Sequence, residues 1–465
     1  MSDGKKLELI RGLGPWTSAA IVVGSMIGTG IFLKPSEMAA DAGSVSIVFA
    51  AWIAGAILSL FGALAFAELG AALPEAGGEY AYLRRGLGPK WGFLFGWMYS
   101  IVGLPAGMSA LAAGLLRFCG FLFPAVAQPI FTLPILLPSS SSPYLFSFTW
   151  AQPLAVLAVV ALTFVNYLGV RVGGRIQVIL TTIKVASVAA IIILAFSLAR
   201  PGGVGLHPFL PASYGGATLI GFFGALAASL WVYDGWEHLG RVGSEVKDPQ
   251  RNIPYALIAG VAFCAVVFIL FSAASHWVLP FSTIVQSQHV ASDVVAGITG
   301  RNAAVWVTLA MALSALGTLN AAILTGSRVP YAMARDGIFF RNTADIHPRF
   351  RTPGGALAFE CVLASLFALS GTFEELTSLF VFALWIFYGL AVVSMMRMRL
   401  TEPELPRPYR CWGYPWVPGT FVAGAAALTV TLWLARPVRS SIGLVLIFSG
   451  LIFYRHWQRK LPPQS

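Results

Sequence analysis

The feature that most constrains the fold is a succession of apolar segments, each long enough to cross a lipid bilayer as a helix. Such a helix needs about 20 mostly apolar residues. Twelve segments qualify: 16–40, 45–73, 91–117, 151–169, 174–199, 216–240, 254–279, 303–332, 354–372, 375–398, 415–435 and 439–457. Only 11% of the residues are charged, against about 25% in soluble domains. The sequence predicts an all-α polytopic membrane protein that forms one transmembrane domain over residues 1–465.

The basic residues indicate how the segments are oriented. The termini and the loops after the even-numbered segments hold 23 Lys and Arg residues. The other loops hold five, which are Arg117, Arg200, Arg301, Arg436 and Arg439. Because cytoplasmic loops carry the excess of Lys and Arg, we expect both termini in the cytoplasm, in a cell (inner) membrane. The net charge of +11 then reflects orientation in the bilayer, and we expect no nucleic acid as a partner.

The sequence gives no sign of catalytic or metal chemistry. The four cysteines form no C-x-x-C pair, and no Cys/His cluster has metal-ligand spacing. The six histidines show no H-x-x-H spacing, and P-loop and G-x-S-x-G motifs are absent. We therefore expect no enzyme activity, no cofactor and no metal site.

Two of the apolar segments carry residues that interrupt a helix. The first contains GSMIGTGIF (24–32), and the sixth contains WVYDGWEHLG (231–240). Broken helices at corresponding places in two halves point to the midplane site of a transporter. Their exposed N–H and C=O groups suit an α-carboxylate and an α-ammonium group. The alternative for the first stretch is a Gly-x-x-x-Gly packing motif, Gly24 to Gly28.

Further blocks of sequence resemble a known family. They are LPEAGGEYAYLRRGLGPKWGFLFGW (73–97), YDGWEHLGRVGSEVKDPQRNIP (233–254), LNAAILTGSRVPYAMARDG (319–337) and PRFRTP (348–353). Together with GSMIGTGIF and the following Lys34-Pro35, they resemble the amino acid–polyamine–organocation (APC) superfamily. The most similar branch is that of the L-type amino acid transporters and bacterial serine/threonine exchangers.

The resemblance implies a five-plus-five inverted repeat, the LeuT-like fold, with discontinuous helices 1 and 6. The repeats would cover about 11–200 and 214–400, with two additional helices at about 412–460. The substrate carboxylate would bind the first break (Ser25, Met26, Ile27, Gly28, Thr29 and Gly30). The amine would bind the second break (Trp231, Val232, Tyr233, Asp234 and Gly235). Trp231 occupies the position of a gating aromatic, with an ordinary packed aromatic as the alternative.

The function that the resemblance implies is secondary transport of neutral α-amino acids by alternating access. Sodium-independent exchange is the favoured mode. Proton symport, and transport of a modified amino acid or a polyamine, are the alternatives. The partners are then the amino acid and the lipid bilayer. Animal members attach a heavy chain through an outer-loop cysteine, which Cys119 could match, but we expect this chain to act without one. The oligomeric state is left open.

Three ionisable residues within the apolar segments are functional candidates. Lys184 matches a lysine that replaces a sodium ion in sodium-independent relatives. It would donate to carbonyls near Gly24 and to groups at 314–320, unless it reaches an interface instead. Glu237, an acid where animal relatives have Asn, could carry a proton, pair with a cation or lie in an open vestibule. Asp234 could cap the second half of its helix or be merely structural.

The charged residues of the inner loops allow two interpretations. Glu245, Lys247, Asp248 and Arg251 follow the sixth segment, and 328–336 follows the eighth. They could form a solvated network that closes an inner gate, or they could only set the topology.

Overall fold

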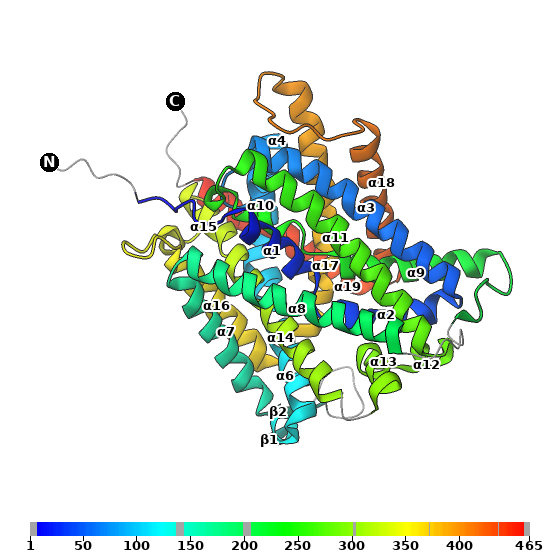
Figure 1. Cartoon of the computed structure of the whole chain (residues 1–465). Helices are drawn as coiled ribbons and strands as arrows, with labels where there is room; N and C mark the ends of the chain where they lie inside the picture. The colour runs from blue at the N-terminus through cyan, green and yellow to red at the C-terminus, as the bar shows by residue number, and fades with distance from the viewer. Residues whose placement is uncertain are drawn as a thin grey trace.

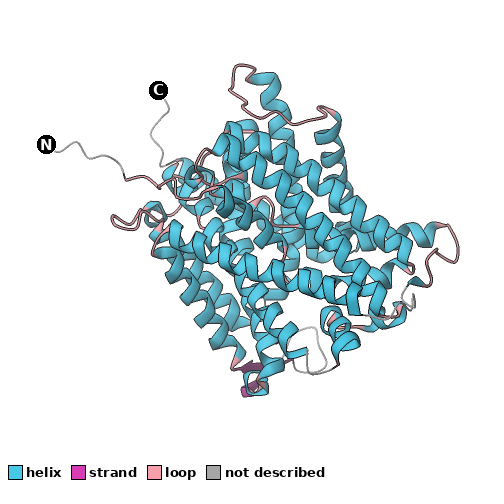
Figure 2. Cartoon of the chain, in the orientation of Figure 1, coloured by secondary structure: helices cyan, strands magenta, loops and turns pink. Residues whose placement is uncertain are grey.

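The structure is a computed structural model that describes residues 7–135, 144–198, 206–300, 304–371, 373–435 and 437–459. Six of the basic residues counted above lie outside this part of the chain: Lys5, Lys6, Arg200, Arg301, Arg436 and Lys460. The described chain is mostly helical (Figure 2).

Among the described residues, ten helices are long and apolar enough to cross a membrane. They are Pro15–Ala42, Val45–Ala72, Pro89–Gly120, Val170–Leu198, Gly216–Arg241, Pro249–Val278, Val305–Arg335, Val381–Thr401, Trp416–Leu434 and Pro437–Gln458. Three apolar helices are shorter: Ala151–Tyr167, Val290–Thr299 and Gly354–Ser370. Every apolar segment predicted from the sequence overlaps one of these helices, but 151–169 and 354–372 match shorter ones.

Several of the long segments are composite. Pro15–Ala42 consists of α1 (Pro15–Met26) and α2 (Gly30–Ala42), and Gly216–Arg241 of α9 (Gly216–Tyr233) and α10 (His238–Arg241). The third segment consists of α5 (Pro89–Met98), a π-helical turn η1 (Tyr99–Gly103) and α6 (Leu104–Leu122). The eighth consists of α14 (Ala304–Gly326) and α15 (Arg328–Arg335). Both predicted helix interruptions are therefore present, and the sequence analysis missed two further irregularities, the π turn and the break between α14 and α15.

The remaining helices are continuous or short. The continuous ones are α3 (Val45–Ala72), α7 (Ala151–Tyr167), α8 (Val170–Leu198), α11 (Pro249–Val278), α16 (Gly354–Ser370), α17 (Phe373–Thr401), α18 (Trp416–Ala435) and α19 (Pro437–Gln458). Short helices in the connections are α4 (Glu79–Gly86), η2 (Pro124–Ala127), η4 (Gly243–Glu245), α12 (Phe281–Gln286), α13 (Val290–Thr299) and η6 (Arg341–Ala344).

The connection between α6 and α7 corrects the all-α expectation in one detail. It holds an antiparallel hairpin of β1 (Pro129–Ile135) and β2 (Tyr144–Thr149) at the end of α6 (Figure 1). Phe131 and Phe148 stack across it at 5.0 Å. The alternation of aromatic and polar residues in YLFSFT has the period of a strand, and this signal was not used.

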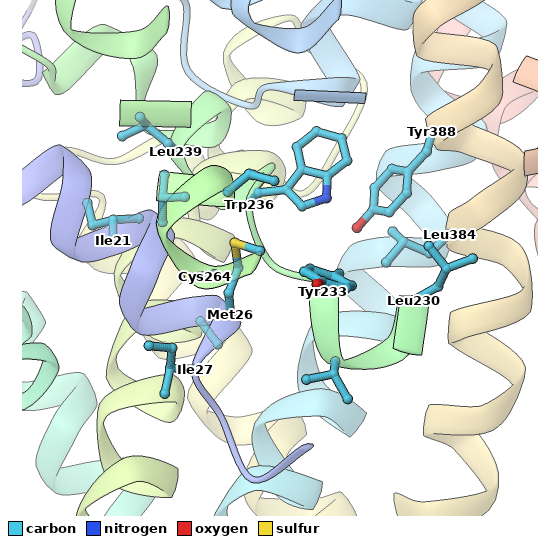
Figure 3. Packing of buried hydrophobic residues seen from close by; sticks show 14 of the residues in the cluster. Ile21, Met26, Ile27, Leu230, Tyr233, Trp236, Leu239, Cys264, Leu384 and Tyr388 are labelled. Carbon is cyan, nitrogen blue, oxygen red and sulfur yellow. The ribbon is translucent and has the colours of Figure 1, made fainter. Parts of the chain in front are cut away.

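The helices pack into one bundle around the two interrupted segments. Helix α3 packs along α11, α2 along α9, and α14 against both α6 and α8; Figure 1 shows α3 and α11 side by side. Helix α18 packs on α3 and α17, and α19 on α5 and α17. One large cluster of buried apolar side chains runs through the bundle. Figure 3 shows its part at the breaks, with Met26, Tyr233 and Trp236.

Candidate functional site

The two helix breaks lie in direct contact at the centre of the bundle. Helix α1 ends at Met26 and α2 begins at Gly30, whereas α9 ends at Tyr233 and α10 begins at His238. Gly235 has φ of +109°, and a Cβ atom added there would lie 2.9 Å from the Cβ of Ser25. Glycine is thus required both by the backbone conformation and by the approach of the first break.

A cavity of about 400 Å³ lies against both breaks. This volume is within the range of small-molecule sites, roughly 300–1,000 Å³. Of the predicted site residues, those lining the cavity are Ser25, Met26, Gly28, Thr29, Gly30, Trp231, Val232, Asp234, Gly235 and Glu237. The structure thus brings together ten residues that come from segments about 200 positions apart in the sequence.

Three predicted site residues lie behind the cavity wall. Ile27 and Tyr233 are fully buried, and the Tyr233 hydroxyl donates a hydrogen bond to the Trp52 carbonyl at 3.2 Å. Lys184 is 1% exposed on α8. Their side chains support the breaks from the protein side, although the carbonyl of Ile27 belongs to the first break itself.

Lys184 bonds to the carbonyl end of the first break. Its Nζ donates to Gly24 O at 2.6 Å, to Ile27 O at 2.9 Å and to Thr318 Oγ1 at 2.9 Å. The predicted contacts with α1 carbonyls and with a group at 314–320 are therefore confirmed. The alternative of a side chain reaching an interface is wrong, because all three donors of the ammonium group have acceptors within the bundle.

The amide end of the first break remains available. The N–H groups of Phe32 and Leu33 bond to Thr29 O at 3.1 and 3.2 Å. The N–H groups of Gly30 and Ile31 precede them in the first turn of α2, where a helix offers no carbonyl partner. The dipole of α2 adds positive potential at this end. Within the break, the N–H groups of Ile27 and Gly28 bond to Val23 O and Met26 O at 2.9 Å each. Thr29 and Gly30, which line the cavity, are therefore the donors of the first break, while Lys184 satisfies its acceptors.

The second break has the opposite arrangement. Glu237 Oε2 accepts a hydrogen bond from Gly235 N at 3.1 Å, so a carboxylate satisfies the donor of this break. The last carbonyls of α9, at Leu230 to Tyr233, have no N–H partner within the helix. Trp231 and Val232 line the cavity at this end. The second break therefore presents acceptors, with the negative end of the α9 dipole.

Glu237 belongs to a buried ion-pair cluster. Its Oε1 lies 3.1 Å from Arg241 Nη2, which also pairs with Glu79 Oε1 at 2.6 Å. Arg241 Nη1 donates to the Tyr99 hydroxyl at 2.8 Å. Since Glu237 is 1% exposed, the open-vestibule alternative is wrong. The geometry matches the alternative in which Glu237 is the fixed partner of a cation.

Asp234 does not cap the second half-helix. The N-cap position of α10 is Glu237, without a side-chain capping bond. Asp234 Oδ1 instead accepts a hydrogen bond from the Tyr388 hydroxyl at 3.1 Å. The capping prediction is therefore wrong: four residues separate the helix ends, so Asp234 is too early in the chain to reach the first turn of α10. It ties the break to α17.

His238, which the sequence analysis did not single out, links the two breaks. Its Nδ1 lies 3.2 Å from Ser25 Oγ, and that hydroxyl donates to Ile21 O at 2.7 Å. Since Ser25 donates to Ile21, its oxygen is left to accept from His238. A histidine one residue after the interrupting acids was the available signal.

Trp231 lies at the border of the cavity. The residue is 37% exposed, and the Lys34 ammonium lies 5.1 Å from the centroid of its ring. A Cβ atom on Gly30 would lie 2.8 Å from Trp231 Cζ3, so Gly30 is required for the ring to rest on α2. Trp231 thus spans from α9 to α2, and its role as a gate stays a prediction.

The other walls of the cavity come from α6, α14 and α17. Small residues Gly103, Gly107, Ala110 and Gly114 face it from α6 and the preceding turn, and Thr318, Ala322, Val381 and Leu384 come from α14 and α17. Tyr99, Arg117 and Arg241 also line it. The sequence analysis predicted none of them as lining the site. The spacing of four, three and four residues along one helical face was the signal for the small-residue wall.

The inner-loop charges divide into a buried pair and exposed residues: Glu245 is buried, whereas Lys247, Asp248 and Arg251 are exposed. Glu245 and Arg328 are both fully buried and form a two-pronged ion pair at 2.6 and 3.0 Å. Asp336 accepts from both Arg84 and Tyr80. The predicted joining of the two loops is confirmed by the Glu245–Arg328 pair. The prediction of a solvated network is wrong for this pair, because the N-terminal segment covers it. The Leu13 N–H donates to Glu245 O, and Leu13 O accepts from the Lys247 N–H.

The sequence relatives are consistent with this architecture. Residues 13–454 match the model of the family described as amino acid permease. The chain is 31% identical to b(0,+)-type amino acid transporter 1 of Mus musculus, over 97% of this chain and 88% of the relative. It is 30% identical to large neutral amino acids transporter small subunit 2 of Homo sapiens (99% and 83%). It is 27% identical to serine/threonine exchanger SteT of Bacillus subtilis (97% and 98%). The chain therefore belongs to the amino acid permease family of polytopic membrane transporters and is not an enzyme.

Proposed function

We propose that this chain transports neutral α-amino acids, with the zwitterion held between the two helix breaks. The substrate carboxylate binds the amide end of the first break, between Ser25 and Gly30. The substrate ammonium binds the carbonyl end of α9, from Trp231 to Asp234. One observation carries this proposal: each break has one polarity satisfied by a protein charge, Lys184 or Glu237, and opposite polarities are left toward one cavity.

We further propose that twelve helices span the membrane, with both termini in the cytoplasm. The ten long helices become twelve when the apolar helices α7 and α16 are included. The breaks then fall in the first and sixth spans, five apart, as a five-plus-five inverted repeat requires. The repeats cover about 11–200 and 214–400, and the additional helices α18 and α19 lie within about 412–460. The uneven distribution of Lys and Arg supports this orientation in the cell membrane.

Exchange without sodium is the mode that the site supports. In the region of the first break, Lys184 fills with a fixed ammonium group a set of carbonyl and hydroxyl oxygens that would otherwise suit a small cation. The printed name of one relative describes an exchanger. Proton symport is the alternative mode. A polyamine is a poorer fit, because it has no carboxylate for the amide end of the first break; a modified amino acid retains one.

We propose that the chain functions without a heavy chain. The name of one relative identifies it as a small subunit, so a partner exists within the family. In this chain Cys119 lies inside α6, three residues before its end at Leu122, and not in the connection that follows. A disulfide to a partner would have to reach into that helix.

The test is transport by the purified chain alone in liposomes. Vesicles preloaded with unlabelled L-serine, L-leucine and L-phenylalanine are placed in a mixture of the same tritiated amino acids. We expect label to enter preloaded vesicles much faster than empty ones, equally in sodium and choline buffers. Protein-free vesicles are the control. Failure of every neutral amino acid to enter would overturn the proposed function; a sodium requirement would overturn only the role given to Lys184.

A further inference from the structure

One buried acid that does not line the cavity has no hydrogen-bond partner among the described residues. Glu360 is on α16, on the face formed by the buried residues Leu357, Glu360, Ala364 and Ala368. It is 2% exposed. Neither of its carboxyl oxygens has a hydrogen-bond partner among the described residues. Glu360 thus differs from the other buried glutamates named above, Glu79, Glu237 and Glu245, each of which pairs with an arginine.

Glu360 lies close to the wall of the cavity through α6. Helix α16 packs against α6 and α7, and Ser109 Oγ on α6 donates to Ala364 O at 2.6 Å, one turn beyond Glu360. Tyr99 belongs to the π turn η1, which leads directly into α6. Tyr99 lines the cavity and accepts from Arg241. Helix α6, which packs on α16 and lines the cavity, therefore connects the surroundings of Glu360 with the site.

The elements packed on α16 provide no counter-charge that pairs with Glu360. The titratable and charged groups on these elements are Tyr167 of α7, Arg328, Tyr331 and Arg335 of α15, Arg341 of η6, Tyr388, Arg397 and Arg399 of α17, and Tyr99, Arg117 and Cys119 of η1 and α6. Arg328 and Arg399 pair with Glu245 and Glu68, and Tyr388 donates to Asp234. No hydrogen bond from any of these groups reaches the carboxyl oxygens of Glu360.

Burial without a partner favours the neutral form of a carboxyl group, because an unpaired ionised group loses its hydration without compensation. Acids at such positions in membrane proteins mark proton relays and ion pathways. We propose that Glu360, and not Glu237, is the proton-binding site that couples amino acid movement to a proton gradient. This inference rests on the proposed transport function and assigns the residue for its proton-coupled mode.

The coupling follows from two protonation states and two conformations. A proton from the outer solution binds the carboxylate to give the neutral acid, which fits the apolar packing between α16 and α6. Loss of the proton on the inner side leaves a carboxylate, which favours a conformation where water reaches it. Net uptake follows when the chain changes conformation only with both the proton and the substrate bound, or with neither, so that each proton moving inward carries one substrate molecule with it.

The test uses wild-type protein and the Glu360→Gln variant in liposomes with an acidic outside and a neutral inside. Gln is isosteric with the protonated acid, so packing is retained. With the mixture of tritiated serine, leucine and phenylalanine, we expect wild type to accumulate label about tenfold per unit of pH gradient at one proton per substrate. A pH-sensitive dye inside should report acidification, and a protonophore should abolish the accumulation. Glu360→Gln should retain exchange at equal pH but lose both signals.

The outcomes separate the inference from the proposed function. Exchange without any effect of the gradient in wild type, or a gradient effect that survives in Glu360→Gln, would overturn the role of Glu360. Absence of all exchange in wild type would overturn the transport function. The control Glu404→Gln changes an exposed acid and should behave as wild type. If Glu360→Gln inserts poorly, Glu360→Met replaces it; gradient-driven accumulation by that variant would equally overturn the proposal.

Discussion

The two helix breaks use the same device with opposite charges. At the first break, the Lys184 ammonium group binds carbonyls of α1. At the second, the Glu237 carboxylate binds the amide of Gly235. Each buried charge removes one polarity of exposed backbone from the cavity. The first break is left with the donors of α2, and the second with the acceptors of α9.

In the proposed function, this difference lets backbone groups at the two ends of one pocket orient a zwitterion. The proposed ligand would supply the hydrogen-bond partners that the backbone groups of each break lack within the protein. The breaks also differ in stability: Lys184 bonds to neutral acceptors, whereas Glu237 depends on Arg241, which must also serve Glu79. The comparison makes the second break the more fragile one.

The largest effect is expected from Arg241→Leu, which removes the shared cation of the second break. Glu79 and Glu237 would be left buried and unpaired, and breaking such a pair costs about 3–5 kcal/mol. We expect poor membrane insertion or a large loss of thermal stability, measured by fluorescence-detected size-exclusion chromatography after heating.

A triple variant tests the cause of that loss. Arg241→Leu combined with Glu79→Gln and Glu237→Gln removes all three charges, and we expect much of the stability to return. Substrate binding should stay weak, because Glu237 and Arg241 line the cavity. If the Arg241→Leu single variant is as stable as wild type, the ion-pair cluster does not hold the second break. The view that each break depends on a buried charge would then fail for the second break.

The next largest effect is expected from Lys184→Met, which keeps the length of the side chain and removes its donors. Gly24 O and Ile27 O would lose their shortest hydrogen bonds. Each keeps one hydroxyl donor: Thr318 Oγ1 lies 3.4 Å from Gly24 O, and Ser314 Oγ lies 3.1 Å from Ile27 O. With one or two acceptors left unsatisfied, we expect about 2–3 kcal/mol less stability and at least about tenfold slower exchange.

The exposed residue Lys247 provides the control for Lys184→Met. It lies in the inner loop, and Lys247→Met should leave both thermal stability and exchange rate near those of wild type. A Lys184→Met variant that exchanges normally would show that the α1 carbonyls need no counter-charge. The view that both breaks depend on a buried charge would then be wrong for the first break.

A pair of glycine variants separates a ligand requirement from a packing requirement. At Gly28 an added Cβ would lie 3.4 Å from Thr318 Oγ1, and the backbone conformation suits other residues. We expect Gly28→Val to insert with near-normal stability but to lose substrate binding, because its side chain enters the cavity. At Gly235 the positive φ and the contact with Ser25 should make Gly235→Ala less stable by about 1–3 kcal/mol.

The measurement for this pair is thermal unfolding with and without a mixture of neutral amino acids. Substrate should stabilise wild type and fail to stabilise Gly28→Val. Gly419→Val, on α18 with no atom within 4 Å of the added Cβ, controls for valine in a helix. Normal binding by Gly28→Val would return GSMIGTGIF to the packing interpretation.

The sequence predicted the elements whose signal is local. Apolar segment lengths gave the helices, and glycines beside hydroxyls or acids located both breaks, because an interrupted helix needs residues of those types. Lys184 was found because a charge in an apolar run is conspicuous, and its acceptors were anticipated in the correct segments.

What the sequence did not provide depends on three-dimensional neighbours. Arg241 was assigned no role, because its two carboxylate partners lie 162 and four positions away. Glu360 was overlooked, although it stands in an apolar helix as Lys184 does. Asp234 was given a capping role that only the length of the break could exclude. The α6 wall was missed because small residues in membrane helices usually indicate packing, and only the cavity shows that these face open space.

The smallest effect is expected where a counter-charge is exposed, as in the Arg85–Glu402 pair beyond the end of α17. The Arg85 guanidinium, 2.7 Å away and 50% exposed, holds the pKa of Glu402 below its usual value. Because the folded-state pKa is lowered, this pair stabilises the protein at neutral pH and the stabilisation disappears as pH falls through the pKa. Solvent limits it to under about 1 kcal/mol. Arg85→Gln should therefore unfold slightly earlier than wild type at neutral pH and at the same temperature at acidic pH. A loss comparable with that of Arg241→Leu would contradict the view that burial, rather than charge pairing itself, makes the two breaks depend on their counter-charges.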